Sequence, residues 1–139
     1  MKKLFGFLMV AVITVCLTGC GSNSSKLICT GEMDGDKATA KVTLKDDKVT
    51  KVIIENITKL PAAGDAAFLA SLIDAKIDAT EEVEGLKMSA KANGTKVTAI
   101  ATMDIVKMSA EDIEDLFGTT DLTKDAFVKY IEDKGLTCK

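Results

Sequence analysis

The sequence predicts an α+β fold: a single antiparallel sheet of about five strands with helices packed on one face, in the order β-β-β-α-β-β-α-α. Three observations predict it. Apolar and polar residues alternate over 38–45, as in a half-buried strand. Apolar residues over 68–77 recur every three or four positions, as in a helix. The pair Asn93-Gly94 is a strong hairpin signal, and short strands joined by tight turns run antiparallel.

Three strands are expected in the first half of the folded region. Residues 26–33 and 38–45 flank the turn sequence Asp34-Gly35-Asp36, and Asp46-Asp47-Lys48 makes the next turn. Residues 49–58 are rich in β-branched side chains, but adjacent isoleucines blur their alternation. A bulge, or burial on both faces, is expected in this third strand.

One amphipathic helix of about four turns is expected after Pro61 and Gly64, with Asp65 as its N-cap. Its apolar stripe consists of Phe68, Leu69, Leu72, Ile73 and Ile77. The helix should end near Glu84-Gly85, where clustered glutamates oppose the helix dipole.

A hairpin follows, with strands over 86–92 and 97–105 on either side of Asn93-Gly94. Many of the inward positions are alanines, which are too small to fill space alone. They favour helices that lie close to the sheet.

Two short helices complete the domain. Ser109, with Asp112 three residues later, resembles a capping box, and Gly118 ends that helix. Thr123 can cap a last helix that stops at Gly135, and the residues beyond it trail without an assigned element.

The first twenty residues have the features of a bacterial lipoprotein signal. Lys2 and Lys3 precede an apolar run over 4–17, and Thr18-Gly19 places small residues directly before Cys20. The run is shorter than the roughly 20 residues that span a bilayer, which favours a cleaved segment. We expect a diacylglycerol on Cys20 and cleavage between Gly19 and Cys20; a plain signal peptide or an N-terminal membrane helix is the alternative.

The domain organisation follows from this signal. Residues 1–19 form the signal peptide, 20–25 the lipidated cysteine and a flexible Ser-rich tether, and 26–139 a single domain. The expected location is the extracytoplasmic face of the cell membrane, to which the protein is held through the lipid on Cys20.

The composition lowers the expectation of catalysis. The chain has no His, and all its basic residues are Lys, so it lacks the usual general base and the planar fork that binds phosphate. Its acids outnumber its bases, which gives no reason to bind nucleic acid. The acidic turns depart from the spacing of a calcium loop. We therefore expect no enzyme, no metal and no cofactor.

Two cysteines remain for the folded domain once Cys16 leaves with the signal and Cys20 carries lipid. In an extracytoplasmic setting, Cys29 and Cys138 are expected to form a disulfide. Two separate buried thiols are the alternative.

One face of the sheet is expected to be rich in Thr and Lys. If the apolar strand positions face the helices, the opposite face carries a candidate binding surface, composed of Thr39, Lys41, Thr43, Lys87, Ser89, Lys91, Thr98 and Thr102. It is either a solvated face or a docking surface for an acidic envelope polymer or an envelope protein.

Three segments, residues 26–30, 46–52 and 134–139, resemble the small bacterial lipoproteins grouped with YehR. The resemblance extends over most of 26–139. It implies a lipoprotein with an α+β fold, and no catalytic residue is carried over from that family.

The sequence thus favours a non-enzymatic, lipid-anchored domain that acts by binding or by occupying the envelope. A small-solute carrier is one alternative, and it should have an apolar cavity of several hundred Å³ on the usual scale of ligand pockets. A hydrolase that uses carboxylates alone is another, and it requires two acids that converge across a cleft.

Overall fold

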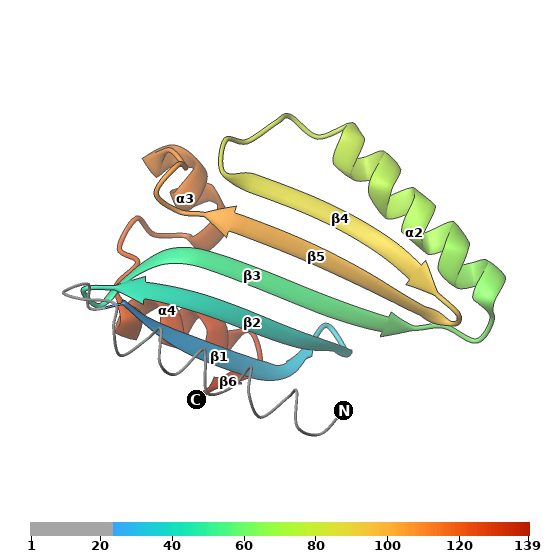
Figure 1. Cartoon of the computed structure of the whole chain (residues 1–139), viewed down its shortest axis with the longest axis horizontal. Helices are drawn as coiled ribbons and strands as arrows, with labels where there is room; N and C mark the ends of the chain where they lie inside the picture. Colours follow the sequence, from blue (N-terminus) through green and yellow to red (C-terminus); the bar gives the residue numbers. More distant parts are fainter. Residues whose placement is uncertain (1–23) are drawn as a thin grey trace, which may run out of the picture.

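The computed structural model describes residues 24–139; the expected signal peptide, its cleavage site after Gly19 and the lipidation site Cys20 lie outside the described residues. Along the chain the elements are β1 (Ser24–Met33), β2 (Asp36–Lys45), β3 (Lys48–Lys59), α2 (Ala63–Asp78), β4 (Leu86–Asn93), β5 (Lys96–Asp104), α3 (Ala110–Phe117), α4 (Lys124–Asp133) and β6 (Leu136–Cys138). The α+β class is confirmed: the strands form one antiparallel sheet in the order β4-β5-β3-β2-β1-β6. Figure 1 shows α3 and α4 behind this sheet and α2 along β4.

Two-residue turns join the strands of three hairpins. Asp34 and Gly35 both have positive φ, 54° and 87°, between β1 and β2, and Asp46 and Asp47, at 52° and 60°, join β2 to β3. Gly94 has a φ of 61° between β4 and β5. Positive φ at the centre of a two-residue turn matches the twist of the flanking strands. The positive φ that these turns require therefore explains why aspartates occupy them, without a bound ligand.

The main core lies between the middle of the sheet and the helices α3 and α4. Val42 and Leu44 on β2 are almost fully buried against this layer. Three aromatic rings fill it from the helix side: the centroid of Phe117 lies 5.8 Å from that of Phe127 and 5.4 Å from that of Tyr130, both edge to face. Edge-to-face packing of this kind stabilises beyond the area that it buries.

The helix α2 begins and ends differently from the sequence prediction. It starts after Ala62, which has no side-chain cap, so Asp65 lies inside the first turn. It ends at Asp78, well before Gly85. The negative charges that follow Asp78 oppose the helix dipole, which accounts for the earlier end.

The predicted apolar stripe of α2 is also wrong in part. The helix contacts the sheet mainly through Ala66 and Ala70, which pack on Val97 of β5, and the predicted Leu69 and Ile73 pack beside them. Phe68 and Leu72 point outward and are 65% and 50% exposed. The large apolar residues predicted the wrong face of the helix in part. Alanine allows α2 to approach the sheet closely, but it adds little to a hydrophobic pattern in the sequence.

β6 is a sixth strand where the sequence predicted a trailing segment. It pairs with β1, and Leu136 lies opposite Gly31. The backbones approach so closely that a Cβ on Gly31 would overlap the carbonyl oxygen of Gly135. Glycine is therefore required at Gly31 for β6 to dock.

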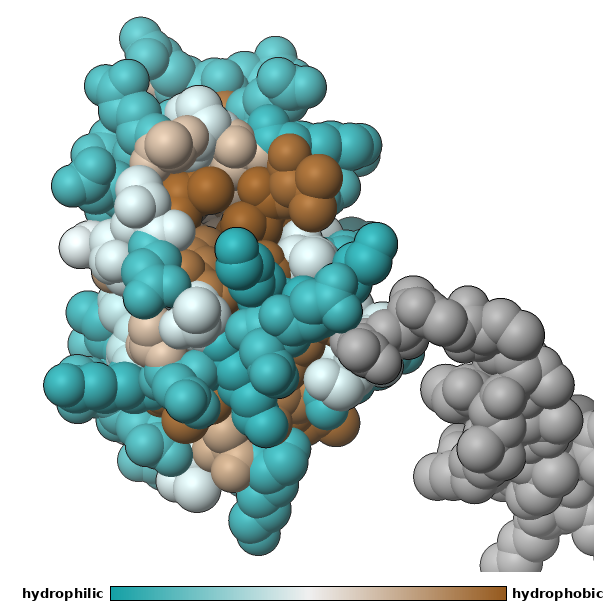
Figure 2. Space-filling view, turned by 90° about the vertical axis from the view of Figure 1, so that its left-hand side faces the viewer, coloured by the Kyte–Doolittle hydropathy of each residue, from teal (hydrophilic) through white to brown (hydrophobic). Residues whose placement is uncertain are grey.

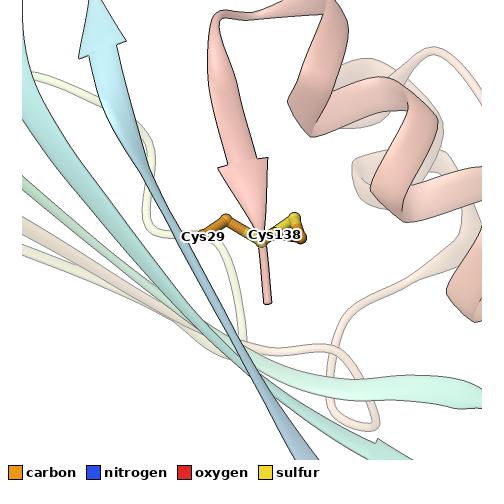
Figure 3. The surroundings of a disulfide bond; sticks show 2 residues. All are labelled: Cys29 and Cys138. Carbon is orange, nitrogen blue, oxygen red and sulfur yellow. A yellow bond between two sulfur atoms is a disulfide. The ribbon is translucent and has the colours of Figure 1, made fainter.

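Cys29 and Cys138 form a disulfide between β1 and β6 (Figure 3). The two residues are directly paired, with their Cα atoms 3.9 Å apart. Cys29 is fully buried. The bond ties the first strand to the last, across a sequence separation of 109.

The strand β1 starts earlier than the predicted domain boundary at residue 26. Ser24 and Ser25 pair with Lys45 and Leu44 of β2, so these two residues belong to the sheet and not to the tether. The sequence pattern missed these two strand residues because their side chains are polar, whereas strand pairing uses the backbone.

The ends of the short helices follow the prediction. The Ser109 side chain accepts a hydrogen bond from the Asp112 backbone N–H, at 3.1 Å, and caps α3. Gly118 ends that helix with a φ of 71°. Thr123 occupies the N-cap position of α4, although its side chain makes no capping hydrogen bond.

Candidate functional site

No helix within residues 24–139 covers one side of the sheet, and we call the residues of β1 to β5 that point to that side the open face. Directly paired residues of neighbouring strands point to the same side of a sheet. One such row across β2, β3, β5 and β4 consists of Lys41, Ile53, Thr102 and Lys87. The helices cover the opposite side, so this row is uncovered by α2, α3 and α4.

All eight residues of the sequence-predicted binding surface lie on the open face. The strand pairing places Thr39 and Ser89 in one row, Thr98 and Lys91 in another, and Thr43 beside Lys51. The lysines and Ser89 are exposed, whereas the threonines are half-buried between their neighbours. The structure thus gathers these residues into one continuous surface.

Positive charge is concentrated on this surface. Its lysines are Lys26, Lys37, Lys41, Lys45, Lys48, Lys51, Lys59, Lys87, Lys91 and Lys96, and its acids are Glu32, Glu55 and Asp104. Residues 24–139 hold 16 lysines and 21 acids, so six lysines and 18 acids lie elsewhere. The domain is acidic as a whole, yet it presents one basic face.

The lysines of the open face are free of internal ion pairs. Between residues 24 and 139 one salt bridge occurs, in which Lys107 approaches Asp104 at 3.8 Å. Lys107 lies outside the strands, and none of the ten open-face lysines takes part. Their charge is therefore directed to solvent or to a partner.

The open face also carries four isoleucines that the sequence analysis did not assign to it as a group. Ile28, on β1, is 50% exposed, and Ile53, Ile57 and Ile100 are half-buried on the central strands. The sequence signal was present: Ile100 alternates with threonines, and the adjacent pair Ile53-Ile54 supplies one isoleucine to each face. Apolar side chains thus lie between the lysines.

One corner of the open face is hollowed. A cavity of about 390 Å³ lies between the strands and the loop that precedes β4. Lys51, Lys87 and Thr102 line it from the sheet, and Glu82 and Glu84 from the loop. Both glutamates are exposed, so the hollow has charge of both signs on its rim.

A second, apolar groove lies on the helix-covered side, between α2 and the sheet. It measures about 160 Å³, and its floor includes Ile54, Ala99 and Ala101. The Oδ1 atom of Asn56 in this groove is buried without a hydrogen-bond partner. The groove is smaller than the 300–1,000 Å³ typical of solute pockets, and thus smaller than the carrier hypothesis requires.

The acids do not form the arrangement that a carboxylate hydrolase requires. No charged side chain among residues 24–139 is buried, so a buried pair across a cleft is not found there. The same residues contain no group of three potential ligands placed to hold a metal ion. Over this range, no helix combines the length and apolar character needed to cross a membrane.

Comparison with known proteins finds lipoproteins that match nearly the whole chain. Over 97% of its length the chain is 25% identical to an uncharacterised lipoprotein of Listeria monocytogenes, of which it covers 94%. It is 27% identical, over 95% of its length, to an uncharacterised lipoprotein of Listeria innocua, of which it covers 90%. The chain is similar to bacterial lipoproteins. No protein-family model matches it.

Two solved structures share the fold. The NMR structure of the Escherichia coli YehR protein has a TM-score of 0.66 at 15% identity, covering 85% of this chain and 92% of that one. The NMR structure of a Streptococcus pneumoniae protein has a TM-score of 0.54 at 19% identity, covering 86% of each chain. The resemblance to the lipoproteins grouped with YehR is thereby confirmed at the level of the fold.

Proposed function

We propose that this protein is a lipid-anchored, extracytoplasmic binding protein without catalytic activity, and that its open face docks an acidic protein of the envelope. The observation that carries the proposal is the separation of charge across the sheet. The open face carries ten lysines and three acids, while the rest of the domain has three times as many acids as lysines. Such a field attracts an acidic partner to one side of the domain only.

The anchoring part rests on two independent supports. The sequence has Thr18-Gly19 directly before Cys20 after a short apolar run. The Listeria relatives, which match nearly the whole chain, are named lipoproteins. Two acyl chains hold a protein firmly at a bilayer, whereas one is marginal.

The anchor is tested by Cys20→Ala. Only a thiol can take the diacylglycerol, so the variant should remain as precursor or be cleaved elsewhere, without incorporating labelled fatty acid. Detergent phase partition and fatty-acid labelling measure this. A Cys20→Ala protein that still labels and partitions with detergent contradicts the anchor, and the Cys16→Ala variant is the matched control because Cys16 is expected to leave with the signal.

A protein fits the open face better than a polyanionic polymer. A polymer of charged units would use the lysines but would gain nothing from Ile28, Ile53 and Ile100. An acidic protein surface with aliphatic residues can use both, because apolar burial gives affinity while charge complementarity gives orientation and rate. A row that alternates lysine with isoleucine, as in Ile28, Lys41 and Ile53, fits such a partner.

Docking is tested with the soluble domain, residues 24–139, as bait in envelope extracts. The open-face variant Lys41→Glu, Lys87→Glu, Lys91→Glu is compared with Lys76→Glu, Lys124→Glu, Lys129→Glu, which changes net charge equally on the helical side. We expect wild type and the helical-side variant to retain an acidic protein at low salt, and the open-face variant to lose it. Binding should weaken as salt rises, because exposed charges are screened.

Other results separate the alternatives. Equal retention by both variants contradicts docking on the open face. Retention of a polysaccharide or phosphate-containing polymer instead of a protein identifies the polymer as the partner. If both variants lose the partner, binding depends on the net charge of the domain and not on the open face.

A further inference from the structure

The chain between the expected lipid and the sheet is short. Cys20 precedes Ser24, the first residue of β1, by four positions. An extended chain spans at most about 3.6 Å per residue, so these positions reach about 14 Å. Given the lipid anchor of the proposed function, Ser24 must lie within that distance of the lipid headgroups.

Several segments share the end of the domain that carries Ser24. Ser24 pairs with Lys45, beside the turn between β2 and β3. The N–H of Val49 donates to the carbonyl of Leu122, and that of Ile105 donates to the carbonyl of Thr50. In Figure 1 this end lies on the left, with α3 above the turn.

The opposite end is out of reach of the tether. A strand of ten residues, such as β1 or β2, is about 33 Å long. The turns at Asp34-Gly35 and Asn93-Gly94 lie at the far ends of these strands. The membrane therefore meets the Ser24 end first.

The Ser24 end carries exposed apolar and lysine side chains beside the acidic turn residues Asp46 and Asp47. Val106, in the loop after β5, is 76% exposed and is followed by the exposed Lys107. A shallow hollow of about 190 Å³ nearby is lined by Val49, Ile105 and Leu122, with Lys48 and Asp121 on its rim. Figure 2 views this end and shows hydrophobic surface gathered at its centre within a hydrophilic rim.

We propose that the Ser24 end rests on the membrane that holds the anchor, with Val106 at the boundary between headgroups and acyl chains. Lys48 and Lys107 can extend their apolar stems along this surface and place their ammonium groups among lipid phosphates. The anchor supplies a high local concentration of lipid, so a small apolar contact is enough to select an orientation. The open face then stands away from the bilayer and remains accessible from the side.

The test uses the full lipidated protein in vesicles of phosphatidylethanolamine and phosphatidylglycerol in equal parts. Val106→Cys is labelled with an environment-sensitive fluorophore, and Asn93→Cys, at the far end, is the matched control. With Cys20 in a thioether and Cys29 in a disulfide, the introduced thiol is the one that labels. Nitroxide carried on the lipid headgroups should quench the label at position 106 several-fold more than the label at position 93.

Mass spectrometry of the same sample reports the diacylglycerol on Cys20, which separates this inference from the proposed function on which it rests. A protein without that lipid overturns both. In a lipidated protein, equal quenching at the two positions, stronger quenching at position 93, or none at either, overturns the orientation alone.

Discussion

The two halves of the helical layer hold the same sheet by different means. Around α3 and α4 the contact consists of large side chains, with Phe127 and Ile131 about 99% buried, and a disulfide secures the neighbouring edge. Around α2 the fully buried residues are only Ala66, Ala70 and Val97, and the larger side chains that pack on them, Leu60, Leu69 and Ile73, are partly exposed. Apolar stabilisation scales with buried area, so the first half should supply most of the stability of the domain.

The comparison also separates two uses of exposed apolar residues. On α2, Phe68 and Leu72 are exposed because a helix with apolar residues all round can bury only one side. On the open face Ile28 is exposed and the other three isoleucines are half-buried, because no element within residues 24–139 covers that side of the sheet. The first set follows from how α2 is packed, and the second leaves an apolar surface available to a partner.

The largest expected effect is that of removing an aromatic ring from the stronger half. Phe127→Ala should lower the free energy of unfolding by about 3–5 kcal/mol, because it leaves a cavity under the sheet. Urea denaturation measures it. Phe68→Ala on the exposed side of α2 is the control, with an expected change within about 0.5 kcal/mol as for other surface positions. Equal losses from the two substitutions would contradict the difference between the halves.

Removing the disulfide should have the next largest effect. The double variant Cys29→Ala, Cys138→Ala should lose about 2–5 kcal/mol, since the bond closes a loop of about a hundred residues in the unfolded chain. Thermal unfolding of this variant beside oxidised wild type measures the loss. Two alkylatable thiols in unreduced wild type would show that the bridge does not form in the protein itself.

A smaller effect is expected where α2 is tied to the edge of the sheet. The Asp74 carboxylate accepts a hydrogen bond from the backbone N–H of Ala90, at 3.2 Å. Asp74→Ala leaves that partly buried donor unpaired, at a cost of about 1–3 kcal/mol. Hydrogen exchange should accelerate in α2 and β4 more than in α4, whereas Asp74→Asn, which keeps an acceptor oxygen, should change it less. Uniform acceleration across the domain would contradict a local tie.

The smallest effect concerns the cap of α3. Ser109→Ala removes the acceptor for the Asp112 N–H and should cost about 1 kcal/mol. Ser109→Thr keeps the hydroxyl and should restore most of the stability. Chemical denaturation of the three proteins decides it, and an unchanged midpoint for Ser109→Ala would contradict the cap.

The parts of the fold that could be predicted are those that rest on local pattern. Alternation over 38–45 predicts a half-buried strand. Asn93-Gly94 predicts a hairpin turn, and Ser109 with Asp112 predicts a helix cap, each from a few neighbouring residues. The sheet, its hairpins and the short helices follow from such signals. The eight-residue surface followed from the same alternation once one face was assigned to the helices.

The parts that could not be predicted depend on contacts between distant segments. β6 is three residues long, and it exists because Gly31 lets the chain after Gly135 approach β1. The face that α2 presents depends on alanine, whose small size becomes informative only when the sheet is in place. The basic character of the open face likewise required the pairing of five strands, because its lysines are scattered from Lys26 to Lys96.

If the protein is anchored as proposed, the disulfide between Cys29 and Cys138 determines what a single proteolytic cut can release. It joins the strand next to the expected anchor to the penultimate residue of the chain. A protease that cuts the exposed stretch after α2, at Glu81 or Glu82, would leave two fragments that remain covalently joined. Nicking at any loop between the two cysteines therefore cannot shed the C-terminal part; release also requires reduction of the bond or a cut on the tether itself.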